Sequence, residues 1–491
     1  MARDALRIHA ADTVAVALRD LATGEQVLGV RLSEPVVRGH KFALVAIAAG
    51  AVVTKYGSPI GRATRAVAAG AHVHSHNLAT ALVGELRYAA PAAGTVTAAT
   101  PTTGGPTWRG YRRGDGRAAT RNEVWVLPTV GCVGLTAEIA ARSGNQRHAG
   151  RIDGVHAFSH PHGCSQLGDD LAGTRAVLAG LATNPNAAGV LLLGLGCESN
   201  QLSALLDAVP EHARGKIRVL ASQTAGDELA AAGALIDELA DEAALARREE
   251  LPLGALTVGL KCGGSDGLSG LTANPLLGRF ADRLAAAGGT PILTEIPEIF
   301  GAEQALLARA VDAQTFAEAA ALINGFKRYY LDQGLPVSEN PSPGNLAGGI
   351  TTLEEKSLGA VQKAGSAPLH AVVGYGAQAP AGGLALLEAP GNDAVSSTAL
   401  VAAGATLVLF TTGRGTPLGF PVPTLKVASN HALAAAKPHW TDFDAESALD
   451  DPAAADAAFC AAIVAHASGT PTASETGGQR AIAIWKRGVT L

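Results

Sequence analysis

The amino-acid sequence predicts an α/β protein in which a small β-rich N-terminal module is followed by two α/β parts with mainly parallel sheets. From Leu6 to about Leu86, short apolar runs alternate with glycines, a pattern typical of short strands joined by tight turns. After Gly110, continuous apolar strands are separated by helical segments, which indicates parallel sheets covered by helices on both faces. The intervening segment is rich in Ala, Thr, Pro and Gly, which is the composition of an extended linker.

Changes in composition divide the 491 residues into four parts. We expect an N-terminal β-rich domain over 1–90, a linker over 91–107, a middle α/β domain over 108–250 and a C-terminal α/β domain over 251–491. This division agrees with a typical domain size of roughly 100 to 200 residues. The strands expected in the N-terminal domain are 14–18, 27–32, 43–47, 52–55 and 72–76, and those expected in the α/β parts are 123–128, 189–195, 256–260, 290–294, 371–374, 383–388 and 406–410.

The charge pattern excludes several classes of partner. Lysine and arginine total 38 and aspartate and glutamate total 43, which gives a formal net charge of -5 at pH 7, and no long run of one sign occurs. The sequence therefore lacks the basic footprint of nucleic-acid binding and a polybasic membrane patch. It also begins without the apolar core of a secretory signal, and its apolar stretches 187–195 and 399–410 are too short to span a bilayer. We expect a cytoplasmic protein acting on a small molecule, either as a single chain or as a homo-oligomer.

Several glycine-rich loops follow the expected strands and carry polar side chains. Open parallel sheets bind ligands at the carboxyl ends of their strands, where such loops meet. A single loop of this kind is ordinary, but their number predicts a shared polar site. The loops are 129–133, 160–170, 194–201, 259–270, 340–345, 389–397 and 411–419.

The five cysteines are an odd number and lie far apart in the chain, which argues against a disulfide framework. Four of them, Cys132, Cys164, Cys197 and Cys262, lie beside glycine in these loops, and the fifth is Cys460. Any one of these cysteines is explained as a small residue that packs under a turn. Together they raise the question of an iron–sulfur cluster. Their spacing matches no compact cluster signature, although a cluster assembled from distant loops stays open.

Two groups of histidines are candidates for metal binding or catalysis. In AHVHSHN, His72, His74 and His76 fall at alternate positions, so an extended backbone would project all three to one face, where imidazoles can ligate a divalent metal. The alternative is a histidine-rich exposed strand. His160 and His162 also alternate, next to Cys164, and the alternative there is a polar turn.

Arg414 and Lys261 are the candidate cations. Arg414 lies between two glycines, where its guanidinium can hold a carboxylate in a bidentate pair. Lys261, at a strand end, suits either a base whose pKa is lowered by burial or a fixed cation beside a developing enolate. The alternative for both is an exposed structural cation. The GYG at 374–376 lacks the third glycine and the acidic residue of a dinucleotide fingerprint, so we expect no NAD.

Several long strings of the sequence belong together. They are RGHKFALVAI, HVHSHN, RNEVWVLPTVGCV, HGCSQLGDD, GLKCGGSDGLSGLTANPLLGRF, ENPSPGNLAGGITTLEEKSLG, APGNDAVSSTAL and LFTTGRGTPLGF, in that order. In content and order they resemble the altronate/galactarate dehydratase family. The resemblance implies that the N-terminal module is an antifreeze-like (SAF) domain. It also implies a hydro-lyase that converts D-altronate to 2-dehydro-3-deoxy-D-gluconate and water. CSQLGDD and HWTDFDA resemble the altronate branch, with galactarate or another related acid as the alternative substrate of the same chemistry.

This resemblance also implies a ferrous cofactor, with Mn²⁺ as a substitute, and it is compatible with a histidine-based site and does not call for an iron–sulfur cluster. Removing the C2 proton of a sugar acid requires a base and a cation to spread the enediolate charge, and the C3 hydroxyl needs an acid or a metal to leave. We expect Lys261 and His160 to be catalytic. We expect Arg414, Ser265, Asp266 and Asn392 to bind the substrate. We expect His74 and His76 to hold the metal, with Cys164 and Cys197 as the second choice of ligands. The identity of the base stays open.

Overall fold

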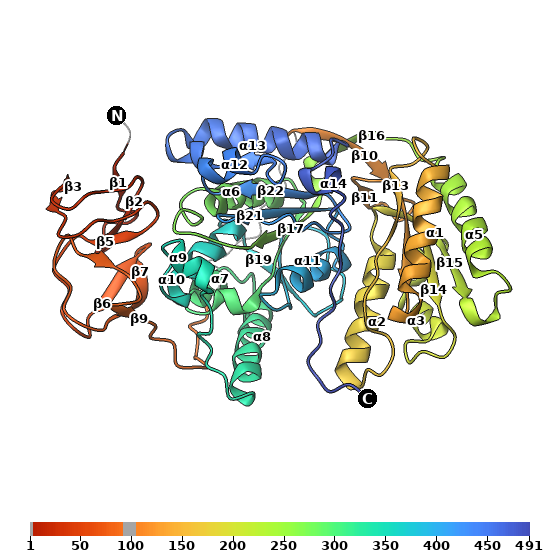
Figure 1. The fold of residues 1–491 in the computed structure, drawn as a ribbon, viewed down its shortest axis with the longest axis horizontal. Helices are drawn as coiled ribbons and strands as arrows, with labels where there is room; N and C mark the ends of the chain where they lie inside the picture. The colour runs from red at the N-terminus through yellow and green to blue at the C-terminus, as the bar shows by residue number, and fades with distance from the viewer. Residues whose placement is uncertain (1–2, 92–104) are drawn as a thin grey trace.

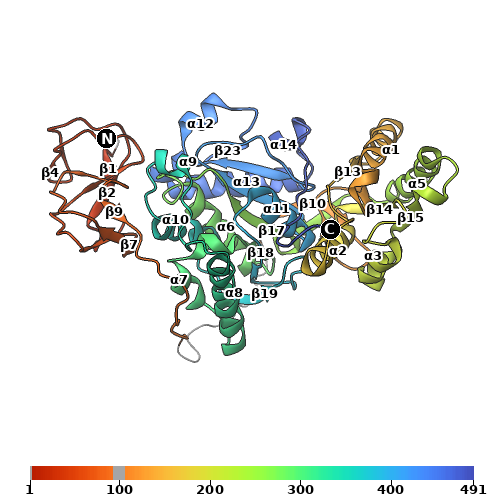
Figure 2. The same ribbon diagram turned by 60° about the horizontal axis from the view of Figure 1, so that its bottom comes forward.

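The computed structural model describes residues 3–91 and 105–491, and it contains three bodies side by side. The N-terminal module lies at one end and the middle part of the chain at the other, with the C-terminal part between them (Figure 1). The same order is seen after rotation (Figure 2). The predicted fold class, β-rich module and two α/β parts, is confirmed. The predicted linker 91–107 lies largely outside the described residues.

The N-terminal module consists of short antiparallel strands. Its sheets have the orders β1-β2-β5-β8, β6-β7-β9 and β3-β4. Tight turns bring loops into close contact: a Cβ on Gly70, which has φ +82°, would lie 2.0 Å from the Arg31 carbonyl oxygen, so this position requires glycine. The strands are β1 (Ala5–Leu6), β2 (Val14–Ala17), β3 (Gln26–Val27), β4 (Val30–Arg31), β5 (Lys41–Ala43), β6 (Val52–Lys55), β7 (Ser58–Ala63), β8 (His72–Val73) and β9 (Leu78–Ala79).

The expected strand 72–76 is wrong beyond Val73, because the chain turns at 74–77. Asn77 causes the turn: its side-chain oxygen accepts from the His74 backbone N–H at 2.9 Å, and its amide donates to the His72 carbonyl at 2.9 Å. Asparagine side chains stabilise turns in this way. The histidines therefore do not share one strand face.

The middle part contains a parallel sheet of order β13-β12-β14-β15 with helices on both faces. Alternate residues of β12 pack into different cores, Val124 and Val126 on one side and Trp125 and Leu127 on the other. Its elements are β12 (Glu123–Pro128), α1 (Gly134–Arg147), β13 (Gly154–Ala157), α2 (Gly168–Thr183), β14 (Ala187–Gly194), α3 (Leu202–Ala208), α4 (Glu211–Arg214), β15 (Ile217–Ala221) and α5 (Glu228–Ala243).

An antiparallel sheet joins the middle part to the rest of the chain. Its order is β11-β10-β16, from β10 (Thr107–Arg112), β11 (Ala118–Ala119) and β16 (Glu249–Pro252). Because β10 pairs with β16, the chain enters and leaves the middle part along neighbouring strands.

The C-terminal part is built on a seven-stranded parallel sheet of order β19-β20-β18-β17-β21-β22-β23. In this order β17 is central, so the loop after it meets the loops after β18 and β21. The strands are β17 (Thr257–Cys262), β18 (Thr290–Leu293), β19 (Leu369–Val373), β20 (Leu384–Leu387), β21 (Leu407–Thr412), β22 (Thr424–Ala428) and β23 (Phe443–Asp444). The helices are α6 (Ala273–Ala286), α7 (Glu303–Leu307), α8 (Ala313–Asp332), α9 (Pro343–Ala347), α10 (Leu353–Ala360), α11 (Asp393–Ala402), α12 (His431–Ala436), α13 (Pro452–Ala467) and α14 (Ala473–Thr476).

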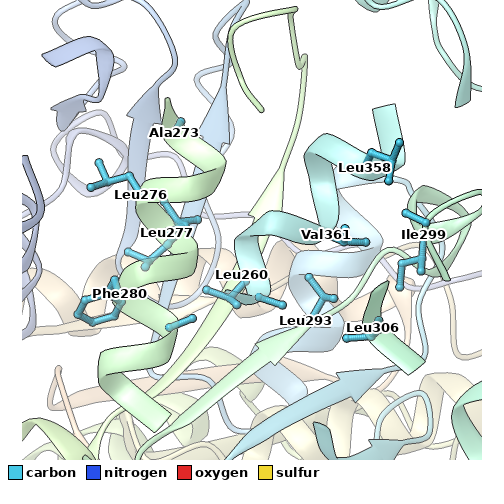
Figure 3. Close-up of a cluster of buried hydrophobic side chains, with 14 of the residues drawn as sticks. Leu260, Ala273, Leu276, Leu277, Phe280, Leu293, Ile299, Leu306, Leu358 and Val361 are labelled. Carbon is cyan, nitrogen blue, oxygen red and sulfur yellow. The ribbon is translucent and has the colours of Figure 1, made fainter. Parts of the chain in front are cut away.

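A continuous apolar core fixes this sheet against its helices. Leu276, Leu277 and Phe280 of α6 belong to one cluster of buried side chains with Leu260 of β17 and Leu293 of β18 (Figure 3). Each such side chain contributes about 1.5 to 3 kcal/mol when fully buried. The core therefore holds the carboxyl ends of β17 and β18 in one place.

The helices of the C-terminal part are shorter or more polar than a membrane span requires. The longest, α8, has 20 residues and alternates buried positions such as Ala319 and Ile323 with exposed polar ones. Within residues 3–91 and 105–491, no helix is both long enough and apolar enough to span a bilayer.

Buried charges join the N-terminal module to the C-terminal part. Glu355 of α10 accepts from Lys41 and Lys55, each at 2.8 Å, and all three side chains are 2% exposed or less. Burial alone would raise the pKa of Glu355, but the two lysines lower it to about 2. The carboxylate is therefore charged at neutral pH and holds two elements of the N-terminal module, β5 and β6, against α10.

We predict that Glu355→Gln lowers the free energy of unfolding at pH 7 by about 3 to 5 kcal/mol, because it leaves two buried lysines without a counter-charge. The depressed pKa of about 2, compared with an ordinary 4.5, means that this stabilisation is present above pH 4.5 and is lost as the pH falls toward 2. The difference between wild type and variant should therefore shrink over that range. Denaturant titrations measure it, with exposed Glu318→Gln as the control. Equal stability of wild type and Glu355→Gln at pH 7 would contradict this account.

Candidate active site

A buried group of charges occupies the carboxyl ends of β17 and β18. Lys261, at the end of β17, is fully buried. Its ammonium donates to Glu295, to Asp393 Oδ1 at 2.8 Å and to the Cys262 carbonyl at 2.7 Å. Three acceptors surround one ammonium, so Lys261 has no freedom to move.

Glu295 connects this lysine to a second one. Lys363, in the 3-10 helix Val361–Ala364, donates to Glu295 Oε2 at 2.8 Å and lies 2.7 Å from Cys262 Sγ. Glu295 has φ 67°, a left-handed conformation that is uncommon for residues other than glycine. This backbone conformation directs its carboxylate back toward β17.

A third lysine reaches the same region from α10. Lys356 donates to Glu298 Oε1 at 2.8 Å and to Asn340 Oδ1 at 2.9 Å, and both charged side chains are buried. Glu298 Oε2 lies 3.3 Å from Cys262 Sγ. We call this group of three lysines and three carboxylates the ion network: Lys261, Lys356, Lys363, Glu295, Glu298 and Asp393.

The ion network shifts the pKa of several of its charged groups and of the neighbouring thiol. Burial would lower the pKa of Lys261, but Glu295 and Asp393 raise it above its ordinary value. Burial would likewise raise the pKa of Glu298, which Lys356 and Lys261 lower. Burial and the Glu295 charge raise the pKa of Cys262 to about 12. Of the two roles considered for Lys261, its carboxylate partners favour the fixed cation over the neutral base.

A cleft of about 370 Å³ opens beside the ion network. This volume lies in the range of roughly 300 to 1,000 Å³ that is usual for small-molecule sites. Asp393, 37% exposed, is its most accessible charged group. The residues lining it are Gly263, Gly264, Glu298, Asn340, Ser342, Asn345, Lys356, Gly391, Asn392, Asp393, Ala394 and Leu418.

A larger hollow of about 620 Å³ lies beside Arg121 and Glu475. At one side of this hollow, Arg121 bonds to Glu475 at 2.8 Å and Arg480 bonds to the same carboxylate at 3.1 Å. This arrangement braces the chain around β11 and α14. The smaller cleft is the better candidate site, because it is the one that opens beside the ion network.

The structure brings several predicted residues to this cleft. Asn392 lines it and caps α11 by accepting from the backbone N–H groups of Ala394 and Val395 at 3.1 Å. Arg414 is exposed at its rim, since a Cβ built on Gly264 would lie 3.2 Å from Arg414 Cβ. Lys261 lies behind Asp393. Predicted substrate binding by Asn392 and Arg414 stays a prediction.

Ser265 and Asp266 hold the loops around the cleft together. Asp266 Oδ1 accepts from the hydroxyls of Ser269 and Ser429 at 2.8 Å, and its Oδ2 accepts from Asn430 at 3.0 Å. The Ser265 carbonyl accepts from Asn345 at 2.8 Å. With both carboxylate oxygens occupied, Asp266 is better explained as a brace than as a ligand for substrate.

His160, which was predicted to be catalytic as Lys261 was, lies away from Lys261. His160 lies in the middle part, after β13, and does not line the cleft. Its Nε2 donates to the Pro128 carbonyl at 2.9 Å and its Nδ1 accepts from the His162 backbone N–H at 3.2 Å. Burial lowers the pKa of His160 to about 4. Both nitrogens thus brace a loop, and the ring is buried, whereas the polar-turn alternative expected it to face water.

The predicted metal ligands His74 and His76 belong to a cluster that includes His40 and His72. The ring centroids of neighbouring pairs are 5.1 to 5.5 Å apart. His40 Nδ1 lies 3.0 Å from His72 Nε2, and His74 Nε2 donates to the carbonyl of Leu346 in α9 at 2.9 Å. The cluster therefore packs on α9, whose Asn345 lines the cleft. His40 was not among the predicted residues.

Most of the ion network was not predicted from the sequence. Glu295, Glu298, Lys356 and Lys363 are missing from the expected site residues, and so is Asp393, although it lies in one of the glycine-rich loops. The sequence does mark Asp393 as a candidate, because it follows an expected strand and begins a helix. Nothing local marks the other four, since they converge only after β17 and β18 pair.

Cys262, Glu295 and Glu298 have ligand atoms within 4.8 Å of one another, which is a geometry that a metal ion can use. Their charges do not fit one. The carboxylates already bind three lysines, and the thiol stays protonated because its pKa is near 12. A divalent cation would add two positive charges to a balanced buried group. We therefore assign no metal here.

Three family models match the chain in order. They are an altronate/galactarate dehydratase SAF domain over residues 3–81, the second domain of D-galactarate dehydratase/altronate hydrolase over 110–244, and the C-terminal domain of D-galactarate/altronate dehydratase over 253–490. The chain belongs to the altronate/galactarate dehydratase family. The resemblance seen in the sequence is thereby confirmed.

Relatives of known name align over nearly the whole chain. An altronate dehydratase of Escherichia coli is 47% identical over 496 residues, and one of Bacillus subtilis is 45% identical over 504 residues, each covering 99% of both chains. A galactarate dehydratase (L-threo-forming) of Escherichia coli is 32% identical over 451 residues, covering 87% of this chain and 85% of its own.

We predict that alkylation of the folded, metal-free protein separates the cysteines into two groups. Cys132, Cys164 and Cys197 are exposed, whereas Cys262 and Cys460 are buried and Cys262 has a pKa near 12. Because the thiolate is the reactive form, the first three should react with iodoacetamide at pH 8, and the last two only after unfolding. Peptide mass spectrometry measures this, and rapid native labelling of Cys262 would contradict the description of the ion network.

Proposed function

We propose that the protein dehydrates D-altronate to 2-dehydro-3-deoxy-D-gluconate and water in the cleft beside the ion network. Two altronate dehydratases of similar length support the substrate, since they are more similar to this chain than the galactarate dehydratase is. We place the reaction in this cleft because the accessible carboxylate of Asp393 is bonded to a buried lysine there.

The reaction has three requirements. A base must remove the proton on C2, a cation must stabilise the enediolate that forms next to the substrate carboxylate, and a proton donor must assist departure of the C3 hydroxyl. Cations that are fixed before the reaction stabilise charge without reorganisation. A buried group of ion-paired lysines meets this condition.

Asp393 is the proposed base. It begins α11, it is the most exposed member of the ion network, and Lys261 holds its Oδ1 at 2.8 Å. Lys261 thus fixes the direction of the carboxylate, which leaves Oδ2 for the substrate. By this account Lys261 is a positioning residue, and its positive charge also lies near the enediolate.

Lys356 and Arg414 are the proposed substrate cations. Lys356 lines the cleft, where its ammonium is held by Glu298 and Asn340, and it is placed to protonate the departing hydroxyl. Arg414 at the rim has the planar guanidinium that suits the substrate carboxylate. After elimination, the enol product tautomerises to the 2-keto acid.

The expected ferrous ion stays a proposal, and the histidine cluster fits it in chemistry but not in geometry. Burial lowers the pKa of His72 to about 3 and also lowers that of His74, so neutral imidazoles are present, as metal binding requires. However, His74 Nε2 is used by Leu346 and its Nδ1 lies 3.0 Å from Ser75 Oγ. In the described part of the chain, no three of these histidines bring nitrogens within 4.8 Å. We therefore assign no role in the reaction to a metal bound at this cluster.

We predict that the purified protein dehydrates D-altronate and that galactarate is turned over at least about tenfold less efficiently, a difference of about 1.4 kcal/mol in transition-state binding. Formation of the 2-keto product measures kcat/KM for each acid. Equal or higher kcat/KM for galactarate would overturn the choice of substrate, and no dehydration of either acid by the metal-reconstituted protein would overturn the function.

We predict that Asp393→Asn lowers kcat for altronate by roughly 100-fold or more, because an amide cannot accept the C2 proton. Substrate binding should change little, since Asn keeps the shape and the contact with Lys261. Asp456→Asn is the matched control: this residue pairs with Arg279 at 2.7 Å, outside the cleft. Steady-state kinetics and melting curves compare the two. A variant Asp393→Asn that melts normally and keeps wild-type kcat would exclude Asp393 as the base.

A further inference from the structure

Three exposed cysteines occupy one edge of the middle sheet. Cys132, Cys164 and Cys197 follow β12, β13 and β14, and these strands are neighbours in the order β13-β12-β14. Because the strands are parallel, their carboxyl ends share one edge of the sheet. Residues that are far apart in the sequence therefore lie in three adjacent loops.

Hydrogen bonds fix these loops to one another. The Gly131 backbone N–H donates to the His162 carbonyl at 2.9 Å. Asn200, fully buried, donates from its backbone to the Gly163 carbonyl at 2.9 Å and from its side chain to the Thr129 carbonyl at 3.2 Å. Asn200 thus joins the loop of Cys197 to the other two.

A glycine precedes each of the three cysteines, and two of these glycines have positive φ angles that L side chains rarely adopt. A Cβ on Gly163, which has φ +102°, would lie 2.1 Å from the Thr129 carbonyl oxygen. A Cβ on Gly196, with φ +131°, would lie 2.6 Å from Gln223 Oε1. The repeated Gly-Cys pair is therefore a structural feature of this edge.

Packing does not explain these cysteines. Cys262 and Cys460 are buried, as a small apolar residue under a turn should be, but the three loop cysteines are exposed and unpaired by disulfides. Two of their sulfurs face donors: Gln223 Nε2 lies 3.5 Å from Cys197 Sγ, and Ser165 Oγ lies 3.9 Å from Cys164 Sγ. Hydrogen bonds to thiolate sulfur are a usual feature of iron–sulfur sites.

The buried carboxylate of Glu198 stabilises the loop of Cys197. It accepts from the Thr129 hydroxyl at 2.5 Å and from the Gly196 backbone N–H at 2.6 Å. The three exposed thiols are the sulfur ligands that this edge offers, and the half-buried imidazole of His162 lies in the same loops.

We propose that Cys132, Cys164 and Cys197 bind an iron–sulfur cluster through three thiolates. The three sulfurs do not all lie within 4.8 Å of one another in the described residues, whereas the ligands of one ion, at about 2.3 Å from it, must lie closer than that. In a four-iron cluster each thiolate binds a different iron, so wider spacing is expected. Neither remaining cysteine of the chain lies at this edge, which leaves one iron of a four-iron cluster without a protein thiolate. This inference stands on the loops alone and does not depend on the proposed reaction.

The test uses the full-length protein purified without oxygen and reconstituted with ferrous ion and sulfide. Iron content, acid-labile sulfide and the iron–thiolate absorption are measured for wild type and for Cys132→Ser, Cys164→Ser and Cys197→Ser. Cys460→Ala, which removes a buried thiol of α13, is the matched control. Circular dichroism and melting curves confirm that each variant is folded.

We expect wild type and Cys460→Ala to hold iron and sulfide in equal amounts, and each loop variant to lose most of both while it remains folded. Binding of iron without sulfide, binding of zinc alone, or no binding after reconstitution would overturn the proposal. Retention of iron and sulfide by the triple serine variant would also overturn it. Because no outcome relies on altronate turnover, a failure here is distinguishable from a failure of the proposed function.

Discussion

The pairing of Glu295 with Lys261 and Lys363 is the interaction on which the candidate site depends. Burying a single charge costs several kcal/mol, and the cost is offset only when partners and hydrogen bonds are close. Here three lysines and three carboxylates meet where β17 and β18 end. Removal of one member would leave its partners uncompensated, so these residues form a unit. That unit fixes the direction of Asp393 and the boundary of the cleft.

Helix α10 connects this unit to the N-terminal module. Its neighbouring residues Glu355 and Lys356 face different partners: Glu355 holds Lys41 and Lys55 of the module, and Lys356 joins the ion network at the cleft. The histidine cluster packs on the adjacent α9. The module is therefore held against the two helices that contribute Asn345 and Lys356 to the lining of the cleft.

Much of the fold follows from local patterns in the sequence, but the ion network does not. The strands 52–55 and 123–128 agree with β6 and β12, because apolar residues in short runs between glycines leave few alternatives. Asn392 could be predicted as a residue of the cleft because it lies in a glycine-rich loop that follows a strand. The strand over 72–76 was wrong because the side chain of Asn77 closes a turn. Glu295 and Lys363 could not be found, since their partners are set by the sheet order and by a left-handed residue after β18.

The most direct measurement is a crystal structure of Asp393→Asn with D-altronate bound. Our account predicts that the sugar acid lies in the cleft lined by Lys356 and Asn392, with its C2 at near-attack distance, about 3 to 3.5 Å, from the side chain of residue 393. Altronate bound instead at the cysteine edge of the middle sheet, or in the cleft with C2 remote from residue 393 and the ion network, would contradict it.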